Sequence, residues 1–389
     1  MWGVALTPTE FVVRAPIHVV TESASEDLVF SGAQVRDRAS GRNLEVLGSR
    51  LYVLPGLIDA HAHLMTSPSI GEAGYTEAWR LSPGQVRGRI RRHLAAQARA
   101  GVTGVRDVGA SVGDVAELAR QRPSTARPLL QASGRFIACP RRYPPAVAHE
   151  VRGSGNLARV AEDEAHRGGG WVKLIGDYLD RDDPGREPAG DWTLEEIEAA
   201  VGAAHGAGAR IAIHAMTAPV GRRAVLAGVD TVEHGCGLAP ADLTEMAARG
   251  IAWTPTLAAF NRLLGRIRAG EPIFPADFME AAVENIQALL PLAAAAGVVI
   301  LCGTDGILRH GDVVSEVLDL TKAGLPLEAA IRSATLEGWR LLGLGEPLRD
   351  GASADALLFN SNPLDDPAVL LRPAYVIRAG RVVRPRSGG

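Results

Sequence analysis

The stretch Leu54-Pro-Gly-Leu-Ile-Asp-Ala-His-Ala-His-Leu64 decides how the rest of this sequence is interpreted. Residues 57–60 form a short apolar run that predicts a buried strand, and this strand leads directly into His61 and His63. Successive side chains of a strand point to opposite faces, so residues two apart point to the same face. Both imidazoles can therefore contact one metal ion while Ala62 points away. The alternative is a pair of histidines that meet by chance near a turn.

From this stretch to about residue 350, short apolar runs alternate with helical patterns. The runs that predict strands are residues 57–60, 104–108, 129–138, 171–175, 210–213, 231–233, 251–254 and 298–302. The helical patterns are residues 85–99, 194–207, 219–227, 241–248 and 276–290, and Thr193 with Glu196 has the spacing of a capping box. Eight strands that alternate with helices over roughly 290 residues predict an α/β fold of the (β/α)8 TIM-barrel type. A doubly wound sheet is the alternative, but it requires a Gly-rich turn where this sequence has His-Ala-His.

Ionisable side chains also mark the ends of other predicted strands. His214 ends Ile-Ala-Ile-His, His234 follows Thr-Val-Glu, and Asp305 follows Cys-Gly-Thr, while Lys173 lies within Trp-Val-Lys-Leu-Ile. The C-terminal ends of barrel strands share one face, where barrel enzymes place their chemistry. Imidazole and carboxylate ligands together suit zinc, iron, manganese or nickel. The pattern therefore predicts a metal site on that face.

Lys173 has two interpretations. A charged ammonium within an apolar strand is costly unless it is paired, and a carboxylate such as that of Asp177 is one candidate partner. Alternatively, the neutral amine reacts with carbon dioxide, and the resulting carbamate bridges two metal ions. The residue types alone leave both interpretations open.

Charge and composition exclude several classes of protein. With 41 basic and 44 acidic side chains in 389 residues, the net charge is −3, so the basic excess typical of nucleic-acid binding is absent. The apolar content of 47% argues against extensive disorder. Three cysteines (Cys139, Cys236 and Cys302) are too few for a disulfide scaffold and fit a reducing compartment. The start has no signal-peptide pattern, and no apolar run is long enough to cross a bilayer. We therefore expect a cytoplasmic protein with neither nucleic-acid nor membrane partners.

The combined motifs resemble the amidohydrolase superfamily. Residues 54–64 look like its signature opening, and Val-Lys-Leu-Ile, Ile-Ala-Ile-His-Ala, Val-Glu-His-Gly and Gly-Thr-Asp-Gly follow in that family's order. Residues 350–364 are similar to the family's return into its small β-sandwich. The branch most similar to this sequence is that of imidazolonepropionase-like and prolidase-like enzymes with a binuclear centre. The resemblance implies a hydrolase barrel over residues 55–350 and a small β-sandwich domain built from residues 1–54 and 351–389.

The resemblance also implies a ligand set and a mechanism. His61, His63 and Asp305 would hold one divalent metal ion, His214 and His234 a second, and Lys173 as N6-carboxylysine would bridge them. Zinc is the expected metal. A metal-bridging hydroxide would attack the substrate carbonyl, because bound water ionises near neutral pH. Asp305 would move the proton from this nucleophile to the leaving nitrogen.

The loops after the strands depart from the family pattern. Residues 139–149 replace a Gly-Gly-His-Gly stretch common in relatives, and residues 176–190 are rich in acidic side chains. Substrate preference therefore does not transfer from relatives. The substrate-contact candidates in these and neighbouring loops are Tyr143, His149, Tyr178, Arg309 and His310.

The predicted activity is hydrolysis of an amide bond in a small molecule, such as a dipeptide, an Xaa-Pro-like peptide or an N-acyl amino acid. A lactone, carbamate or ester would suit the same site. A mononuclear deaminase or cyclic-amide hydrolase is the alternative, but deaminases of this superfamily usually place Glu where this sequence has Thr217. A catalytically silent scaffold is the non-enzyme alternative, although all six ligand positions hold competent side chains. Relatives often assemble, so a homo-oligomer is compatible with the sequence.

Overall fold

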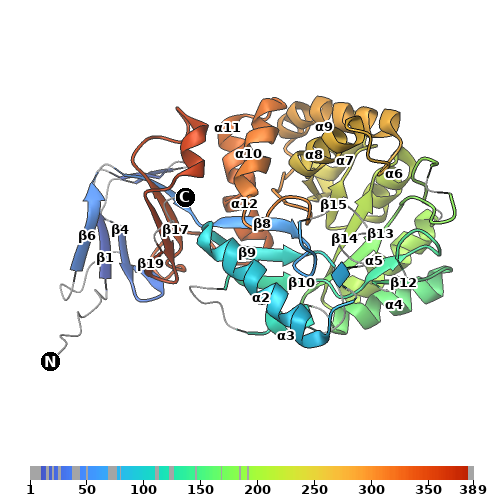
Figure 1. Cartoon of the computed structure of the whole chain (residues 1–389), viewed down its shortest axis with the longest axis horizontal. Coiled ribbons are helices and arrows are strands. Elements are labelled where there is room, and N and C mark those ends of the chain that lie inside the picture. The colour runs from blue at the N-terminus through green and yellow to red at the C-terminus, as the bar shows by residue number, and fades with distance from the viewer. Residues whose placement is uncertain are drawn as a thin grey trace.

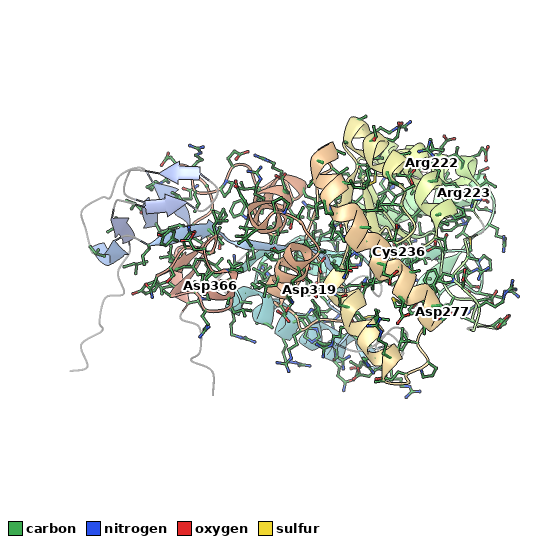
Figure 2. All side chains as sticks on the ribbon, turned by 90° about the horizontal axis from the view of Figure 1, so that it is seen from above. Arg222, Arg223, Cys236, Asp277, Asp319 and Asp366 are labelled. Carbon is green, nitrogen blue, oxygen red and sulfur yellow. The ribbon has the colours of Figure 1, made fainter. Side chains whose placement is uncertain are left out.

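The computed structural model describes residues 10–14, 17–19, 22–24, 28–36, 44–49, 51–68, 77–78, 80–109, 114–121, 127–144, 147–167, 169–183, 185–190 and 192–383. Two groups of strands follow one another along the long axis: one lies at the left end in Figure 1, and the other runs from the middle toward the right end. Figure 2, viewed from above, shows the same separation: Arg222 and Arg223 of helix α6 (Ala218–Ala227) lie at one end, and Asp366 lies toward the other. The outer ends of the expected terminal domain, residues 1–9 and 384–389, lie outside the described residues.

The larger group of strands is parallel throughout its described pairings. It comprises sheets with the orders β10-β9-β8 and β12-β11-β13-β14-β15-β16. The strands are β8 (Leu57–Ala62), β9 (Val102–Asp107), β10 (Leu129–Ala132), β11 (Phe136–Ala138), β12 (Ala148–Glu150), β13 (Trp171–Ile175), β14 (Arg210–Ala215), β15 (Thr231–His234) and β16 (Ala252–Thr254). Strands such as β9 and β13 are buried at every position, as expected where both faces of a parallel sheet are covered.

Helices flank these strands and alternate with most of them along the chain (Figure 1). They are α2 (Pro83–Arg99), α3 (Asp114–Ala119), α4 (Ser154–Arg167), α5 (Leu194–Gly206), α6, α7 (Pro240–Arg249), α8 (Leu257–Arg268), α9 (Ala276–Ala296), α10 (Val313–Lys322), α11 (Leu327–Ser333) and α12 (Leu336–Leu341). The capping box predicted at α5 is present, because Thr193 Oγ1 accepts from Glu196 N and Glu196 Oε2 accepts from Thr193 N. The predicted α/β class is confirmed. None of the helices in the described part of the chain has the length and apolar character needed to cross a membrane.

Three element predictions differ from the structure, and two of them concern the runs 129–138 and 276–290. The run 129–138 forms two strands, β10 and β11, with Gly134 between them. The carboxylate of Glu164 fills the space beside Gly134 and accepts from Arg135 N at 2.8 Å, so the chain turns there instead of continuing. The helix expected to end before Pro291 continues to Ala296. Pro291 removes one hydrogen-bond donor, but buried Leu290 and Ala293 hold the last turns against the core.

Backbone contacts link the edges of the two parallel sheets. Ser133 forms a parallel bridge with Trp171, and Ile300 forms one with Trp253. The run 298–302, expected as a strand, is not a regular strand; nevertheless Ala60 N donates to Cys302 O at 2.8 Å. Residues 300–302 therefore lie between β16 and β8.

The smaller group of strands combines both ends of the chain. Its sheets have the orders β5-β4-β1-β6 and β19-β18-β17-β7-β2-β3. The strands are β1 (Glu10–Arg14), β2 (Ile17–Val19), β3 (Glu22–Ala24), β4 (Leu28–Ser31), β5 (Gln34–Arg36), β6 (Leu44–Ser49), β7 (Tyr52–Pro55), β17 (Ala356–Phe359), β18 (Tyr375–Arg378) and β19 (Arg381–Val383). The antiparallel pairing of β17 with β7 joins the two ends, and a short 3-10 helix, η1 (Pro367–Leu371), precedes β18. Strand β7 leads into β8, so this group fixes the strand that carries His61.

Candidate metal centre

Six ionisable side chains converge on one pocket. They are His61, His63, Lys173, His214, His234 and Asp305, which all line the same cavity. His61, Lys173, His214 and His234 belong to β8, β13, β14 and β15, whereas His63 and Asp305 follow β8 and the 300–302 segment. The parallel strands therefore bring together residues separated by more than 200 positions in the sequence.

His61, His63 and Asp305 form the tightest part of the group. Asp305 Oδ1 lies 3.1 Å from His61 Nε2 and 3.3 Å from His63 Nε2. One donor atom from each of the three residues lies within 4.8 Å of the others. Burial by itself raises the pKa of Asp305, but the charges of His61 and His234 outweigh it and hold the pKa well below its usual range. Asp305 is therefore a carboxylate at neutral pH, and the three side chains can share a divalent cation.

In three of the four pocket histidines, the ring nitrogen Nδ1 has a hydrogen-bond partner. His61 Nδ1 lies 2.6 Å from Glu233 Oε2, and His63 Nδ1 lies 2.8 Å from the carbonyl oxygen of Gly109. His234 Nδ1 lies 2.7 Å from Thr256 Oγ1. A carbonyl or carboxylate partner makes Nδ1 the protonated nitrogen, which leaves Nε2 with its lone pair directed into the pocket. For His61 and His63, the hydrogen bonds therefore select the tautomer that binds metal.

The other side of the pocket carries His214, His234 and Lys173. The rings of His214 and His234 are 4.5 Å apart, and those of His234 and His61 are 5.1 Å apart. Among the described residues, neither Lys173 Nζ nor His214 Nε2 has a hydrogen-bond partner, although both are buried. Burial lowers the pKa of Lys173 to about 8 and that of His214 well below its usual value. A minor but appreciable fraction of the Lys173 amine is therefore neutral near physiological pH, far more than for an ordinary lysine.

Lys173 does not pair with Asp177. The Asp177 carboxylate accepts from Met216 N at 2.9 Å and from the hydroxyl of Thr217 at 2.6 Å. His214 Nε2 lies 3.7 Å from Asp177 Oδ1. Asp177 therefore fixes the backbone directly after His214, and the alternative in which it neutralises Lys173 is not what the structure shows.

Two of the six residues hold unusual backbone conformations. His234 has φ 67° and Asp305 has φ 54°, a region that non-glycine residues rarely occupy. Asp59 supports the conformation of Asp305. The backbone N and the hydroxyl of the preceding residue, Thr304, donate to the Asp59 carboxylate at 3.1 and 2.7 Å. Such strain persists only where surrounding contacts impose it, and it clusters at functional sites.

The substrate-contact candidates divide into two sets. Tyr143 and Tyr178 line the pocket, and their rings are 4.8 Å apart. His149, Arg309 and His310 are not among the lining residues. His149 Nε2 bonds to Glu164 at 3.0 Å, Arg309 is exposed, and buried His310 donates to the carbonyl of Thr66 at 3.0 Å. These partners hold both histidines away from the cavity.

Sequence reasoning missed Glu233 and Arg106. Arg106 Nη2 lies 2.8 Å from Glu233 Oε1, and both side chains are fully buried. Arg106 also donates to Thr231 Oγ1 at 2.8 Å and stacks on Trp171, with its guanidinium carbon 4.4 Å from the ring centre. The available signal was a charged residue within an apolar strand, the same signal that singled out Lys173.

The apolar wall of the pocket was also missed. It is formed by Phe136, Ile175, Met216, Phe260, Leu263, Ile273, Phe274 and Ile307. Several of these residues come from α8 and from the segment before α9, which carry no motif that the sequence would reveal.

The donor set fits a divalent transition metal. Buried imidazole nitrogens and a carboxylate converge, and outer partners orient several of them. In the described part of the chain, three buried nitrogens of the site, His61 Nε2, Lys173 Nζ and His214 Nε2, have no hydrogen-bond partner. A group of this composition is poorly explained by packing alone, because buried polar atoms are normally hydrogen-bonded.

The chain is similar in sequence and in fold to known proteins. The chain is 31% identical over 338 residues to the uncharacterized protein Rv2915c of Mycobacterium tuberculosis, with 86% of each chain covered. Among solved structures, a Xaa-Pro dipeptidase with bound methionine gives a TM-score of 0.82 at 22% identity, covering 96% of this chain and 100% of that one. A prolidase complexed with N-methylphosphonate-L-proline gives 0.81 at 24% identity, covering 97% and 100%. These structures share a TIM-barrel-type α/β fold with this chain. The sequence model of the Amidohydrolase family matches residues 52–383. The chain belongs to the amidohydrolase family and is a hydrolase acting on carbon–nitrogen bonds.

Proposed function

We propose that this protein hydrolyses an amide bond of a small molecule at a site that holds two divalent metal ions, with zinc as the expected metal. The observation that carries the proposal is the convergence of four histidines, a lysine and an aspartate in one buried pocket. His61, His63 and Asp305 would hold one ion, as the distances between their donor atoms support.

Lys173, His214 and His234 would complete the site. The lysine amine is buried, has no hydrogen-bond partner among the described residues, and has a pKa lowered to about 8. A neutral amine in this position can react with carbon dioxide, and the resulting carbamate oxygens would bridge the two ions. When bound, the metal ions would polarise the scissile carbonyl and bring the pKa of a bound water toward neutrality.

Asp305 would act as the proton carrier. It is ionised at neutral pH, and Oδ1 lies within 3.3 Å of two imidazoles at the centre of the pocket. It would accept a proton from the attacking water and deliver it to the leaving nitrogen as the C–N bond breaks. The backbone directly before it is held in place, because Thr304 donates two hydrogen bonds to Asp59.

The candidate substrates are a dipeptide, an Xaa-Pro-like peptide or an N-acyl amino acid, and a lactone, carbamate or ester would suit the same site. The deaminase alternative is less favoured, because Thr217 bonds to Asp177 where those enzymes use a glutamate as acid. We also propose that the parallel strands and residues 300–302 close into a barrel. The terminal strands would form the small sandwich domain over residues 1–54 and 351–389.

A hydrolysis screen tests the proposed activity. Dipeptides, N-acyl amino acids, neutral amides and lactones would be incubated with metal-loaded protein, and the products would be separated chromatographically. We expect release of an amine and a carboxylic acid from at least one amide, together with loss of this activity on chelation and its return when metal is restored. Turnover that survives complete removal of metal would contradict the proposal.

A further inference from the structure

The pocket beside the candidate metal centre has an uncharged wall. The space within it is about 690 Å³, a figure that includes the part open to solvent. Apart from the six predicted metal ligands, its described lining consists of eight apolar or aromatic side chains, two tyrosines, Thr66 and Gly306. None of these twelve residues carries a charge.

The aromatic members form a continuous surface that reaches the histidines. Phe136 lies 4.9 Å from Tyr143 and 5.6 Å from His63, measured between ring centres. Tyr178 lies 5.9 Å from Phe274 on the segment before α9 and 5.6 Å from His214. An apolar group on either side of the scissile bond would therefore contact rings that also border the reacting centre.

Three arginines in the loops at residues 139–149 and 176–190 lie close to carboxylates in or next to these loops. Arg141 pairs with Asp180 at 3.2 Å, and Arg142 lies 3.7 Å from the same carboxylate and also donates to the carbonyl of Tyr178. Arg181 pairs with Glu150 at 2.6 Å. The positive charges of these three arginines are therefore already balanced by protein carboxylates and do not require a substrate anion.

Two of the segments that follow the barrel strands in the sequence contain no cationic residue. Residues 69–76 and 110–113, which follow β8 and β9 and lie outside the described residues, contain no Lys, Arg or His. Arg309 is exposed and is not among the lining residues. A substrate carboxylate held against this wall, away from the metal ions, would therefore be removed from water with no cationic side chain of the wall to pair with it, which is unfavourable.

We infer that the substrate is an electrically neutral amide with aromatic or branched apolar groups, and that amides bearing a free carboxylate are disfavoured. This inference rests on the proposed function and narrows its substrate class away from free dipeptides. In the reaction, water oxygen bonds to the carbonyl carbon, the C–N bond breaks, and the nitrogen gains a proton. The products are a carboxylic acid and an amine.

A matched pair of substrates tests the inference. The anilide of phenylacetic acid and its analogue with a para-carboxylate on the aniline ring have the same scissile bond and differ by one charge. With metal-loaded protein, we expect kcat/KM to be higher for the neutral compound by about tenfold or more, because the anion loses its hydration. Equal values, or preference for the anion, would overturn the inference and leave the proposed hydrolase function intact.

Variants locate the cause of the preference. Phe274→Arg places a cation on the apolar wall and should reduce the preference by about tenfold, whereas Phe274→Leu should retain it. Arg309→Ala should leave the ratio for the two compounds unchanged. A selective loss of the anionic substrate in Arg309→Ala would identify Arg309 as a carboxylate clamp and overturn the inference.

Binding separates failure of the inference from failure of the proposed function. If neither anilide is hydrolysed, the affinities of their ketone isosteres, in which CH2 replaces the scissile NH, are measured by calorimetry. Tighter binding of the neutral ketone by about tenfold or more supports the inference about the pocket, even though the proposed activity has failed. Equal binding, or no binding of the neutral ketone, overturns it.

Discussion

Glu233 connects the candidate metal centre to the buried interior, and Glu233→Gln tests that connection. In the native arrangement, the carboxylate accepts from His61 Nδ1 at 2.6 Å and from Arg106 Nη2 at 2.8 Å. Burial alone raises the pKa of Glu233, but Arg106 and His61 hold it well below its usual range, so the group is anionic. The glutamine side chain has almost the same shape but no charge.

The substitution acts on both partners. An amide N–H placed at the former Oε2 position would donate to His61 Nδ1, which favours the tautomer with its proton on Nε2 and blocks metal binding. Loss of an outer partner of a metal ligand typically costs about 10–100-fold in metal affinity. Arg106 would remain buried without its counter-charge, a defect of up to about 3–5 kcal/mol in the free energy of unfolding. The amide oxygen can still accept from Arg106, so we expect a value toward the lower end.

Metal content after equilibrium dialysis and urea unfolding of the metal-free protein give the two readouts. Glu164→Gln is the matched control, because Glu164 is also buried and hydrogen-bonded, to Arg135 N and His149, but lies outside the metal site. We expect the control to lose stability while retaining native metal affinity. Native metal affinity in Glu233→Gln would refute the assigned role of Glu233 in selecting the His61 tautomer.

Three further substitutions test the bridging lysine, the proton carrier and one source of pH-dependent stability. Lys173→Ala should lose one of two metal equivalents, and its kcat should fall by at least about 100-fold. Activity should recover in part when a short carboxylic acid and excess metal are added. Full activity without the acid would exclude the bridging role. Asp305→Asn should retain at least one metal equivalent, measured by elemental analysis. Its kcat should fall by about 100-fold or more, because the amide cannot transfer the proton. An unchanged kcat would assign proton transfer to another group. Burial lowers the pKa of His310 from 6.5 to about 3, so between these values the unfolded chain binds more protons than the folded one. Stability should therefore fall as pH drops below about 6.5, by up to about 1.4 kcal/mol per pH unit from this group. Urea midpoints at pH 5 and 7 should differ less in His310→Gln than in the native protein, and an identical difference would count against this origin.

The positions of the predicted metal ligands could be inferred from sequence because strand geometry is regular. His61 and His63 share a face through the two-residue period of a strand, and the ends of parallel strands meet at one edge. The structure accordingly brings His214, His234 and Asp305 to the same pocket. Their roles as ligands remain predictions that the metal measurements test.

Other features depend on contacts between distant segments and could not be inferred locally. Glu233 reads as an ordinary strand residue before His234, and only the fold places it against His61 and Arg106. Phe274 lies in a segment without a motif, and its place on the pocket wall is set by the packing of α8 and α9. The continuation of α9 past Pro291 is likewise decided by tertiary burial, which outweighs the local cost of proline.

Metal stoichiometry is the direct test of a site for two metal ions in this pocket. Protein purified in the presence of bicarbonate would be dialysed against zinc, freed of unbound metal, and measured by elemental mass spectrometry, with His61→Ala as the comparison. We expect about two equivalents of zinc per chain in the native protein and at most about one in the variant. No bound metal in the native protein, or the same content in both proteins, would contradict it.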